Sequence, residues 1–287
     1  NKIKNTRAGI LKINWPLNKR RSWNSKRQNE DNRTNLEGIM SVIYIMWLRQ
    51  LKRYWRSKSR VIGILGQPLL FLIALGFGFG PIFEKAGGGN YIQFLAPGII
   101  AMTILFNAVF NGMEVMWDKQ FGFLKETLVA PVPRYKIMIG RTFGGATVAF
   151  IQGLIIFLIA IIIGFRPESI IKLPLAFLFM AIISFIFTAL GITIASKLED
   201  MQSFPIIINF IIMPLFFLSG ALFPLDQVPK AIKIISLINP LSYGVDSLRD
   251  SLTGISHIGF LLNSVVLILT LIIIGLVGTY FFSRIEV

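Results

Sequence analysis

Long apolar segments are the feature that most restricts the fold of this 287-residue chain. Crossing a bilayer as a helix takes about 20 mainly apolar residues, because backbone polar groups find no water there. Only 15% of the residues are charged and the mean hydropathy is +0.68, which excludes an ordinary water-soluble enzyme. The sequence therefore predicts an all-α polytopic membrane protein with six transmembrane helices. The six segments are 61–83, 91–113, 136–164, 173–196, 204–223 and 258–282.

Positive charge is concentrated at the start of the chain. Residues 1–60 contain sixteen Lys and Arg against three acidic residues, and the formal net charge of the whole chain is +15. Residues 1–39 are polar and without periodicity, so we expect a basic disordered arm. One hypothesis is that native translation starts at Met40 and that the arm is not native. Because membrane spans follow, anionic lipid headgroups explain this charge better than nucleic acid, and we expect no nucleic-acid partner.

Residues 40–60 have the pattern of an amphipathic helix. At ~100° per residue, an aromatic and aliphatic sector lies opposite an arginine sector. A helix of this kind suits the plane of the lipid headgroups, and packing against other parts of the protein is the alternative. The apolar sector consists of Tyr44, Trp47, Leu48, Leu51 and Trp55, and the basic one of Arg49, Arg53, Arg56 and Arg60. We therefore divide the chain into an arm (1–39), an interfacial helix (40–60) and a six-span transmembrane domain (61–287).

Cations directly before the first span determine the expected orientation. Six Lys and Arg lie between Arg49 and Arg60, which by the positive-inside rule places the N-terminus in the cytoplasm. With six spans, the connections 114–135 and 197–203 and the C-terminus are then cytoplasmic as well. We expect a multi-pass protein of the plasma membrane with both termini inside.

Several kinds of catalytic site are excluded by composition. The chain has no cysteine and only one histidine, His257, so disulfides, thiol nucleophiles and multi-histidine metal sites are impossible. No G-x-x-x-x-G-K-[ST] phosphate loop occurs, and the glycines at 87–89 lack the required lysine. We therefore expect a non-catalytic chain with no metal and no cofactor of its own.

Polar residues inside the apolar segments form a second class of candidates. Asn107, Asn111 and Glu114 are spaced i, i+4 and i+7, so they share a helical face, and Gln152 and Asn209 lie in later segments. Such residues line a substrate pathway or a dimer interface, or they hold helices together by hydrogen bonds. We prefer hydrogen bonding between helices.

The connection after the second span contains a short helical pattern. Phe121, Leu124, Lys125 and Leu128 fall on one side of a helix, and prolines at 131 and 133 end it. An apolar face in a water-facing loop indicates a protein partner or contact with lipid headgroups.

Two blocks of sequence resemble the type-2 export permeases of ATP-binding-cassette (ABC) transporters, above all the daunorubicin-resistance and nodulation-export branch. The first block is Phe-Gly-Phe-Leu-Lys-Glu at 121–126, followed by Ala-Pro-Val-Pro-Arg at 130–134 and Gly-Gly-Ala-Thr at 144–147. The second is Leu-Ser-Gly-Ala-Leu-Phe-Pro-Leu at 218–225, followed by Ile-Asn-Pro-Leu-Ser-Tyr-Gly-Val-Asp at 238–246. The resemblance covers residues 40–287.

The resemblance implies a permease subunit whose ATP and Mg are bound by a separate ATP-binding cassette subunit. It implies that a coupling helix in the first cytoplasmic loop contacts that subunit, and that two permease copies form a homodimer or heterodimer in the lipid bilayer. It also implies short external re-entrant helices within 226–255, before the last span, and export of a hydrophobic, drug-like or lipid-linked molecule (multidrug or lipid/polysaccharide efflux). The coupling residues would be Phe121, Gly122, Phe123, Leu124, Lys125, Glu126, Pro131 and Arg134.

Two other functions compete with this interpretation. A secondary carrier driven by an ion gradient predicts acidic residues within the spans, and apart from Glu114 the predicted spans hold none. A non-transporting membrane scaffold would leave the resemblance of the 121–134 segment unexplained.

Overall fold

The computed structural model describes residues 42–85, 89–124, 132–225 and 228–285, all within one compact unit, Val42–Val287. These residues form helices and no strand, which confirms an all-helical fold for the described part of the chain. The predicted arm, the proposed start at Met40 and three of the predicted coupling residues lie outside the described residues. Those three are Lys125, Glu126 and Pro131.

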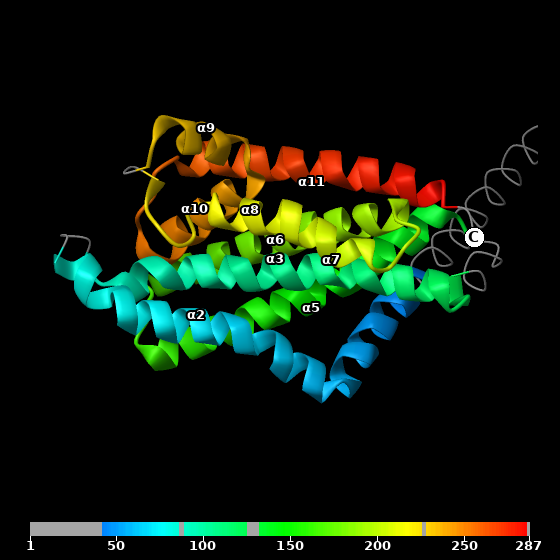
Figure 1. Cartoon of the computed structure of the whole chain (residues 1–287), viewed down its shortest axis with the longest axis horizontal. Helices are drawn as coiled ribbons and strands as arrows, with labels where there is room; N and C mark the ends of the chain where they lie inside the picture. The colour runs from blue at the N-terminus through cyan, green and yellow to red at the C-terminus, as the bar shows by residue number, and fades with distance from the viewer. Residues whose placement is uncertain (1–41, 86–88, 125–131, 226–227, 286–287) are drawn as a thin grey trace, which may run out of the picture. The chain divides into compact units, whose positions relative to one another are not determined.

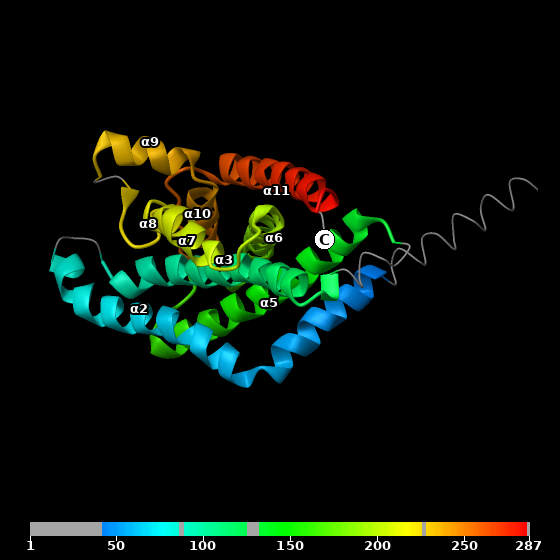
Figure 2. The same ribbon diagram turned by 45° about the vertical axis from the view of Figure 1, so that its right-hand side comes forward.

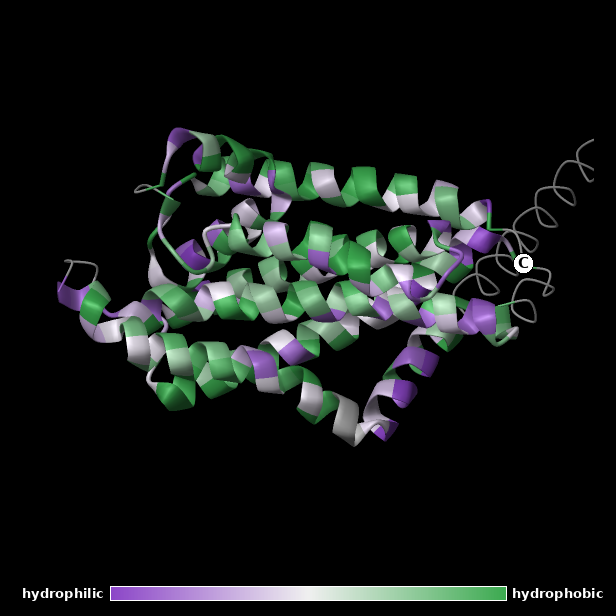
Figure 3. Ribbon diagram, viewed as in Figure 1, coloured by the Kyte–Doolittle hydropathy of each residue, from purple (hydrophilic) through white to green (hydrophobic). Residues whose placement is uncertain are grey.

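Five helices are long and apolar enough to cross a membrane. Figure 1 shows them lying roughly side by side. Hydrophobic residues cover their middle parts, and hydrophilic residues are more frequent toward the ends (Figure 3). The helices are α2 (Lys58–Lys85), α3 (Tyr91–Gln120), α5 (Arg134–Ile163), α6 (Leu173–Lys197) and α11 (Phe260–Ser283).

The sixth predicted span, 204–223, is not confirmed as a membrane crossing. Its apolar residues form a shorter helix, Ser203–Phe217, made of α7 (Ser203–Ile207), a π-helical segment (Ile208–Ile212) and α8 (Met213–Phe217). At 1.5 Å per residue this helix is roughly 22 Å long, against about 30 Å of hydrocarbon. The chain then turns at Gly220, whose φ of +74° lies in the left-handed region and is incompatible with a continuing helix.

Helix α3 is the centre of the bundle. It packs against α2, α5, α6 and α10 (Pro240–Thr253). Of the residues in its most apolar 18-residue stretch, 78% are buried. The corresponding fraction is 17% for α2 and 11% for α11, which lie at opposite edges of the bundle in both views (Figure 1, Figure 2). The apolar residues of these two edge helices therefore face outward, as expected for contact with lipid.

Glycine allows α3 and α6 to approach closely. A Cβ atom added to Gly112 would lie 2.2 Å from the backbone oxygen of Gly191, so no larger residue fits without moving the helices apart. Small residues at such crossings are the usual means of packing helices in membranes.

Two short helices precede α11 in the region where the family resemblance implied them, 226–255; their external, re-entrant position stays a prediction. They are α9 (Lys230–Ile238) and α10. The side chain of Asn239 caps α10 by accepting a hydrogen bond from the backbone N–H of Leu241, and most of α10 is buried beside the start of α3. We call this end of the bundle the α10 end, and the opposite one, where α3 ends and α5 begins, the 121–133 end.

A helix over residues 42–56 precedes α2, and the chain turns sharply between them (Figure 2). This helix packs on α5, where Met46 lies against Gly140 and Gln50 against Gly144, and the indole N–H of Trp47 donates to Thr147 Oγ1 at 3.0 Å. Tyr44 and Trp55 are exposed. The contact face thus differs from the apolar sector predicted by periodicity, and a location in the headgroup plane stays a prediction.

Candidate functional site

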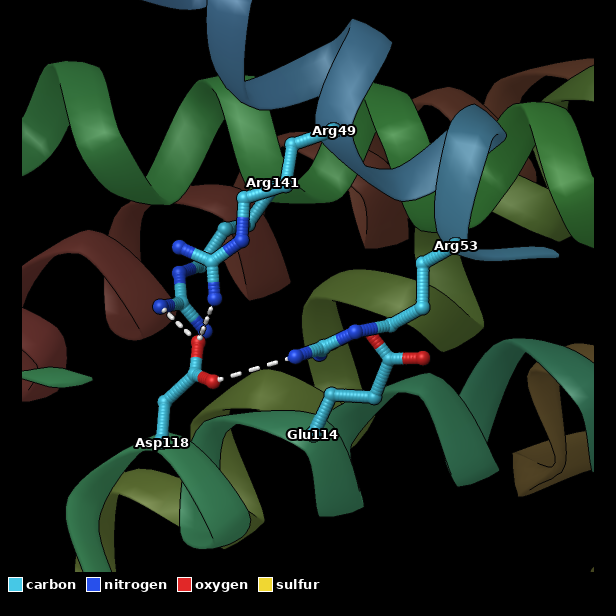
Figure 4. A network of polar contacts seen from close by, with 5 residues as sticks. All are labelled: Arg49, Arg53, Glu114, Asp118 and Arg141. Atoms are coloured by element: carbon cyan, nitrogen blue, oxygen red, sulfur yellow. Dashed lines mark hydrogen bonds and ion pairs between the residues drawn. The ribbon is translucent and has the colours of Figure 1, made fainter. Parts of the chain in front are cut away.

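Five charged side chains meet near the 121–133 end of the bundle (Figure 4). We call them the charged cluster: Arg49 and Arg53 of helix 42–56, Glu114 and Asp118 of α3, and Arg141 of α5. Residues four apart on a helix share a face. The pair Glu114 and Asp118 therefore faces the pair Arg49 and Arg53 as the two helices pass each other.

Asp118 is the central member of the charged cluster. Its Oδ2 accepts hydrogen bonds from the Nη2 atoms of Arg49 and Arg141, both at 2.6 Å. Arg53 lies between the two carboxylates, 3.3 Å from Glu114 Oε2 and 3.6 Å from Asp118 Oδ1. One carboxylate therefore links the end of α3, the start of α5 and the preceding helix 42–56.

Burial makes the Asp118–Arg141 pair the most consequential contact of the charged cluster. The side chains of Asp118 and Arg141 are each 2% exposed, whereas Arg49 and Arg53 retain 35% and 37% exposure. Removing one member of a buried ion pair leaves the other charge uncompensated, typically at a cost of about 3–5 kcal/mol. With three guanidinium groups against two carboxylates, the charged cluster has a net charge of +1.

The predicted coupling segment begins next to the charged cluster. Helix α3 ends at Gln120, and Gly122 adopts a φ of +79°, which interrupts the helix between Phe121 and Phe123. Phe121 and Phe123 are 69% and 53% exposed, and Leu124 is fully buried. The prediction that Phe121 and Leu124 share a helical face is therefore wrong, because Gly122 reverses the local backbone. The two phenylalanines point outward and Leu124 anchors the segment to the bundle.

Arg134, the last predicted coupling residue, contacts the chain itself. It is the first residue of α5, and its Nη1 donates to the backbone oxygens of Ser283 and Ile285 at 2.8 and 2.9 Å. These carbonyls lie at the C-terminus of α11, where no helical N–H remains to bond them. Arg134 thus holds the end of α11 against the start of α5.

The predicted polar residues within the spans do not form one group. Asn107 and Asn111 are buried, and Asn111 Nδ2 donates to the backbone oxygens of Asn107 and Gly145 at 2.9 and 3.2 Å, joining α3 to α5. Gln152 is fully buried in α5. Asn209 is exposed on the short helix Ser203–Phe217. A role of these residues in a pathway or dimer interface stays a prediction.

A second pair of buried charges lies at the α10 end. Asp246 accepts hydrogen bonds from Ser256 Oγ, the backbone N–H groups of His257 and Ile258, and Asn263 Nδ2, at 2.8–3.1 Å. Burial raises the pKa of Asp246, but these four bonds outweigh it and hold the pKa below its ordinary value. Asp246 therefore stays ionised and fixes the loop between α10 and α11.

Arg249 is the other buried charge at the α10 end. Its Nη2 donates to the backbone oxygen of Gly220 at 2.9 Å, and the guanidinium lies 4.0 Å from the centre of the Phe94 ring. Burial lowers the pKa of Arg249 to about 10, although the nearby charge of Asp246 raises it. Arg249 thus fastens the turn after α8 to the start of α3.

Sequence reasoning missed Asp118, Arg141 and the roles of Asp246 and Arg249. Two i, i+4 pairs of like charge, Arg49 with Arg53 and Glu114 with Asp118, have opposite signs and were a readable signal that their helices meet. The contact between Asp118 and Arg141 depends instead on how α3 and α5 pack. Within the part of the chain that the structure describes, no three His, Asp or Glu side chains come close enough to share a metal ion.

Comparison with known proteins places this architecture in a family. Residues 41–253 match the family described as ABC-2 type transporter. The transport permease ycf38 of Cyanophora paradoxa is 33% identical over 254 residues, covering 82% of this chain and 84% of that protein. Nodulation protein J of Rhizobium leguminosarum bv. viciae is 28% identical, over 83% of this chain and 94% of its own length. The inner membrane transport permease YadH of Escherichia coli (strain K12) is 26% identical, over 74% and 83%. The chain belongs to the ABC-2 type transporter permeases, the membrane transport subunits of ABC transporters.

Proposed function

We propose that this permease exports a hydrophobic, drug-like or lipid-linked molecule, driven by ATP hydrolysis in a separate subunit that docks at the 121–133 end. The observation that carries the docking site is the pair of exposed rings of Phe121 and Phe123. Large exposed aromatic side chains at a loop are typical anchors of protein interfaces. In this proposal the 121–133 end and both termini lie in the cytoplasm, and ATP and Mg bind only to the partner.

The charged cluster supplies a route by which a push on the docking segment would move the permease. Asp118 and Arg141 join the two helices on either side of residues 121–133, and Arg49 extends the link to helix 42–56. A displacement of the loop would therefore shift α3, α5 and helix 42–56 together. A partner changes the balance between two states only if it binds them with different affinity, so nucleotide-driven closure of the partner would favour one position of this unit.

A second permease copy, identical or related, would cover the short helix Ser203–Phe217. Its outward face carries Ile206 and Phe210, 58% and 79% exposed, beside the exposed polar side chain of Asn209. The helix is shorter than a bilayer crossing, and non-helical backbone at membrane depth needs cover by protein or an aqueous path. Both features support an interface or a pathway at this face.

The competing ion-driven carrier is not favoured. The described spans hold three acidic residues, and each lies near a helix end: Glu84 near the end of α2, and Glu114 and Asp118, which are paired with arginines, near the end of α3. A carrier of that class needs ion ligands near the middle of the membrane.

ATP hydrolysis by the purified complex of this chain with its ATP-binding subunit tests the docking site. Phe123→Asp should weaken assembly about thirtyfold, as expected for an interface anchor worth about 2 kcal/mol, and transport-coupled ATPase activity should fall with it. Ile255→Asp is the matched control, because Ile255 is 55% exposed in the loop at the opposite end. Assembly and activity unchanged in Phe123→Asp would contradict the proposal.

A further inference from the structure

A hollow of ≈ 690 Å³ runs along one face of helix 42–56. Its lining recurs at helical spacing and combines an apolar end with a row of cations. We call it the basic hollow, and it is lined by Ile45, Leu48, Arg49, Lys52, Arg53, Arg56 and Ser57. Among the described residues that line it, four are basic and none is acidic, so the face formed by helix 42–56 presents positive charge.

The positive charge of the basic hollow exceeds what the neighbouring carboxylates neutralise. Arg49 and Arg53 reach Asp118 and Glu114, yet the charged cluster keeps a net charge of +1. Lys52 and Arg56 are exposed, and neither takes part in an ion pair among the described residues. An anion bound here would therefore meet two cations that have no ion-pair partner among the described residues.

The surroundings of the basic hollow are those of a membrane surface. Trp55 and Tyr44 are 73% and 57% exposed on the same helix, and Ile45 at one end of the hollow is 58% exposed. The helix leads directly into α2, which is mostly hydrophobic (Figure 3) and largely unburied. Trp and Tyr concentrate at the headgroup level of membranes, and cations there attract anionic lipids. Both the charge and the apolar wall suit an amphiphilic anion better than a free one.

We propose that the basic hollow is a binding site for the phosphate-bearing headgroup of an anionic glycerophospholipid. Lys52 and Arg56 would contact the phosphate, Arg49 and Arg53 would add charge from the side of the cluster, and Ile45 and Leu48 would contact the start of the acyl chains. Guanidinium groups suit phosphate oxygens because they donate two parallel hydrogen bonds. The site does not depend on the direction of transport or on the docking segment.

Native mass spectrometry of the full chain in detergent tests the site with two lipids of equal acyl chains, phosphatidylglycerol and phosphatidylcholine. The wild type should bind the first phosphatidylglycerol at least tenfold more tightly than phosphatidylcholine. The double variant Lys52→Gln/Arg56→Gln should lose most of this preference, because each cation near a membrane surface contributes roughly a fivefold change. The charge-retaining variant Lys52→Arg/Arg56→Lys should keep it.

Lys230→Gln/Lys233→Gln is the matched control, since it removes two exposed cations from α9, at the α10 end of the bundle. This control should retain the wild-type preference. Equal binding of the two lipids by the wild type, or an equal loss of preference in both Gln variants, would overturn the proposal. Displacement of phosphatidylglycerol by millimolar inorganic phosphate would also overturn it, because the hollow would then be a site for free anions.

Discussion

Both ends of α3 hold buried charges, but the two ends satisfy them differently. At the 121–133 end, Asp118 is bonded to guanidinium groups from two other elements, and Arg53 lies between two carboxylates. At the α10 end, Asp246 is bonded to neutral donors within the next 17 residues, and Arg249 to a carbonyl and a ring. The first arrangement joins separate helices through charges, and the second fixes a local turn.

The two arrangements differ in how easily their contacts can be exchanged. Asp246 is held by four donors, two of them backbone N–H groups of the loop that follows α10, so this loop is fixed at several points. Ion pairs that share partners can be exchanged at lower cost, because Arg53 already lies within 3.3 and 3.6 Å of two different carboxylates. We infer that the 121–133 end transmits motion and that the α10 end resists it.

The largest effect is expected from Asp118→Asn. The substitution leaves Arg141 buried without its carboxylate, so unfolding free energy should fall by about 3–5 kcal/mol. Thermal unfolding of the purified chain measures this. Glu199→Gln, an exposed acid at the same end, should change little. If Asp118→Asn lowers the free energy of unfolding no more than this control does, the charged cluster does not stabilise the fold as proposed.

Asp246→Asn should come next, with a loss of about 2–3 kcal/mol, because an amide replaces only part of the four bonds that the carboxylate accepts. Hydrogen exchange should increase within 254–259 and not near 121–133. Increased exchange at both ends would show that the two ends are not independent.

The same residue predicts a dependence on pH. Since the pKa of Asp246 in the folded chain lies below its ordinary value of 3.8, the unfolded chain takes up the proton first as pH falls. The contribution of ionised Asp246 to the free energy of unfolding is therefore present above pH 3.8 and is lost as the pH falls below that value. Below pH 3.8 the unfolding temperature of the wild type should drop more steeply than that of Asp246→Asn, and parallel curves would refute this.

Glu114→Gln should have a smaller effect, about 1 kcal/mol or less. Its partner Arg53 is 37% exposed and is also within reach of Asp118, so water and the second carboxylate compensate part of the loss. A loss as large as that of Asp118→Asn would mean that the cluster does not centre on Asp118.

The smallest effect is expected from Arg134→Gln. Losing the bonds to the backbone oxygens of Ser283 and Ile285 should cost about 0.5 kcal/mol and let the last turn of α11 fray. Faster hydrogen exchange confined to 281–285 checks this, and an effect on subunit assembly would instead support a direct docking role for Arg134.

Apolar length predicted six spans, of which five correspond to long apolar helices, and the family resemblance implied the short helices before α11. The span at 204–223 was not confirmed, because composition does not reveal that the chain turns at Gly220. The shared helical face of Phe121 and Leu124 was wrong, because Gly122 adopts a positive φ. The Asp118–Arg141 pair joins residues 23 apart on two helices, so it emerges only from packing. Local pattern was therefore a good guide to elements and a poor one to contacts between them.

Labelling of single cysteines tests the central claim that the 121–133 end faces the cytoplasmic ATP-binding partner. The chain contains no cysteine, so Phe121→Cys and Ile255→Cys each introduce one exposed thiol without background. If this end faces the cytoplasm, a membrane-impermeant maleimide labels Ile255→Cys in intact cells and Phe121→Cys only after permeabilisation. Labelling of Phe121→Cys in intact cells would place this end outside the cell and overturn the docking site.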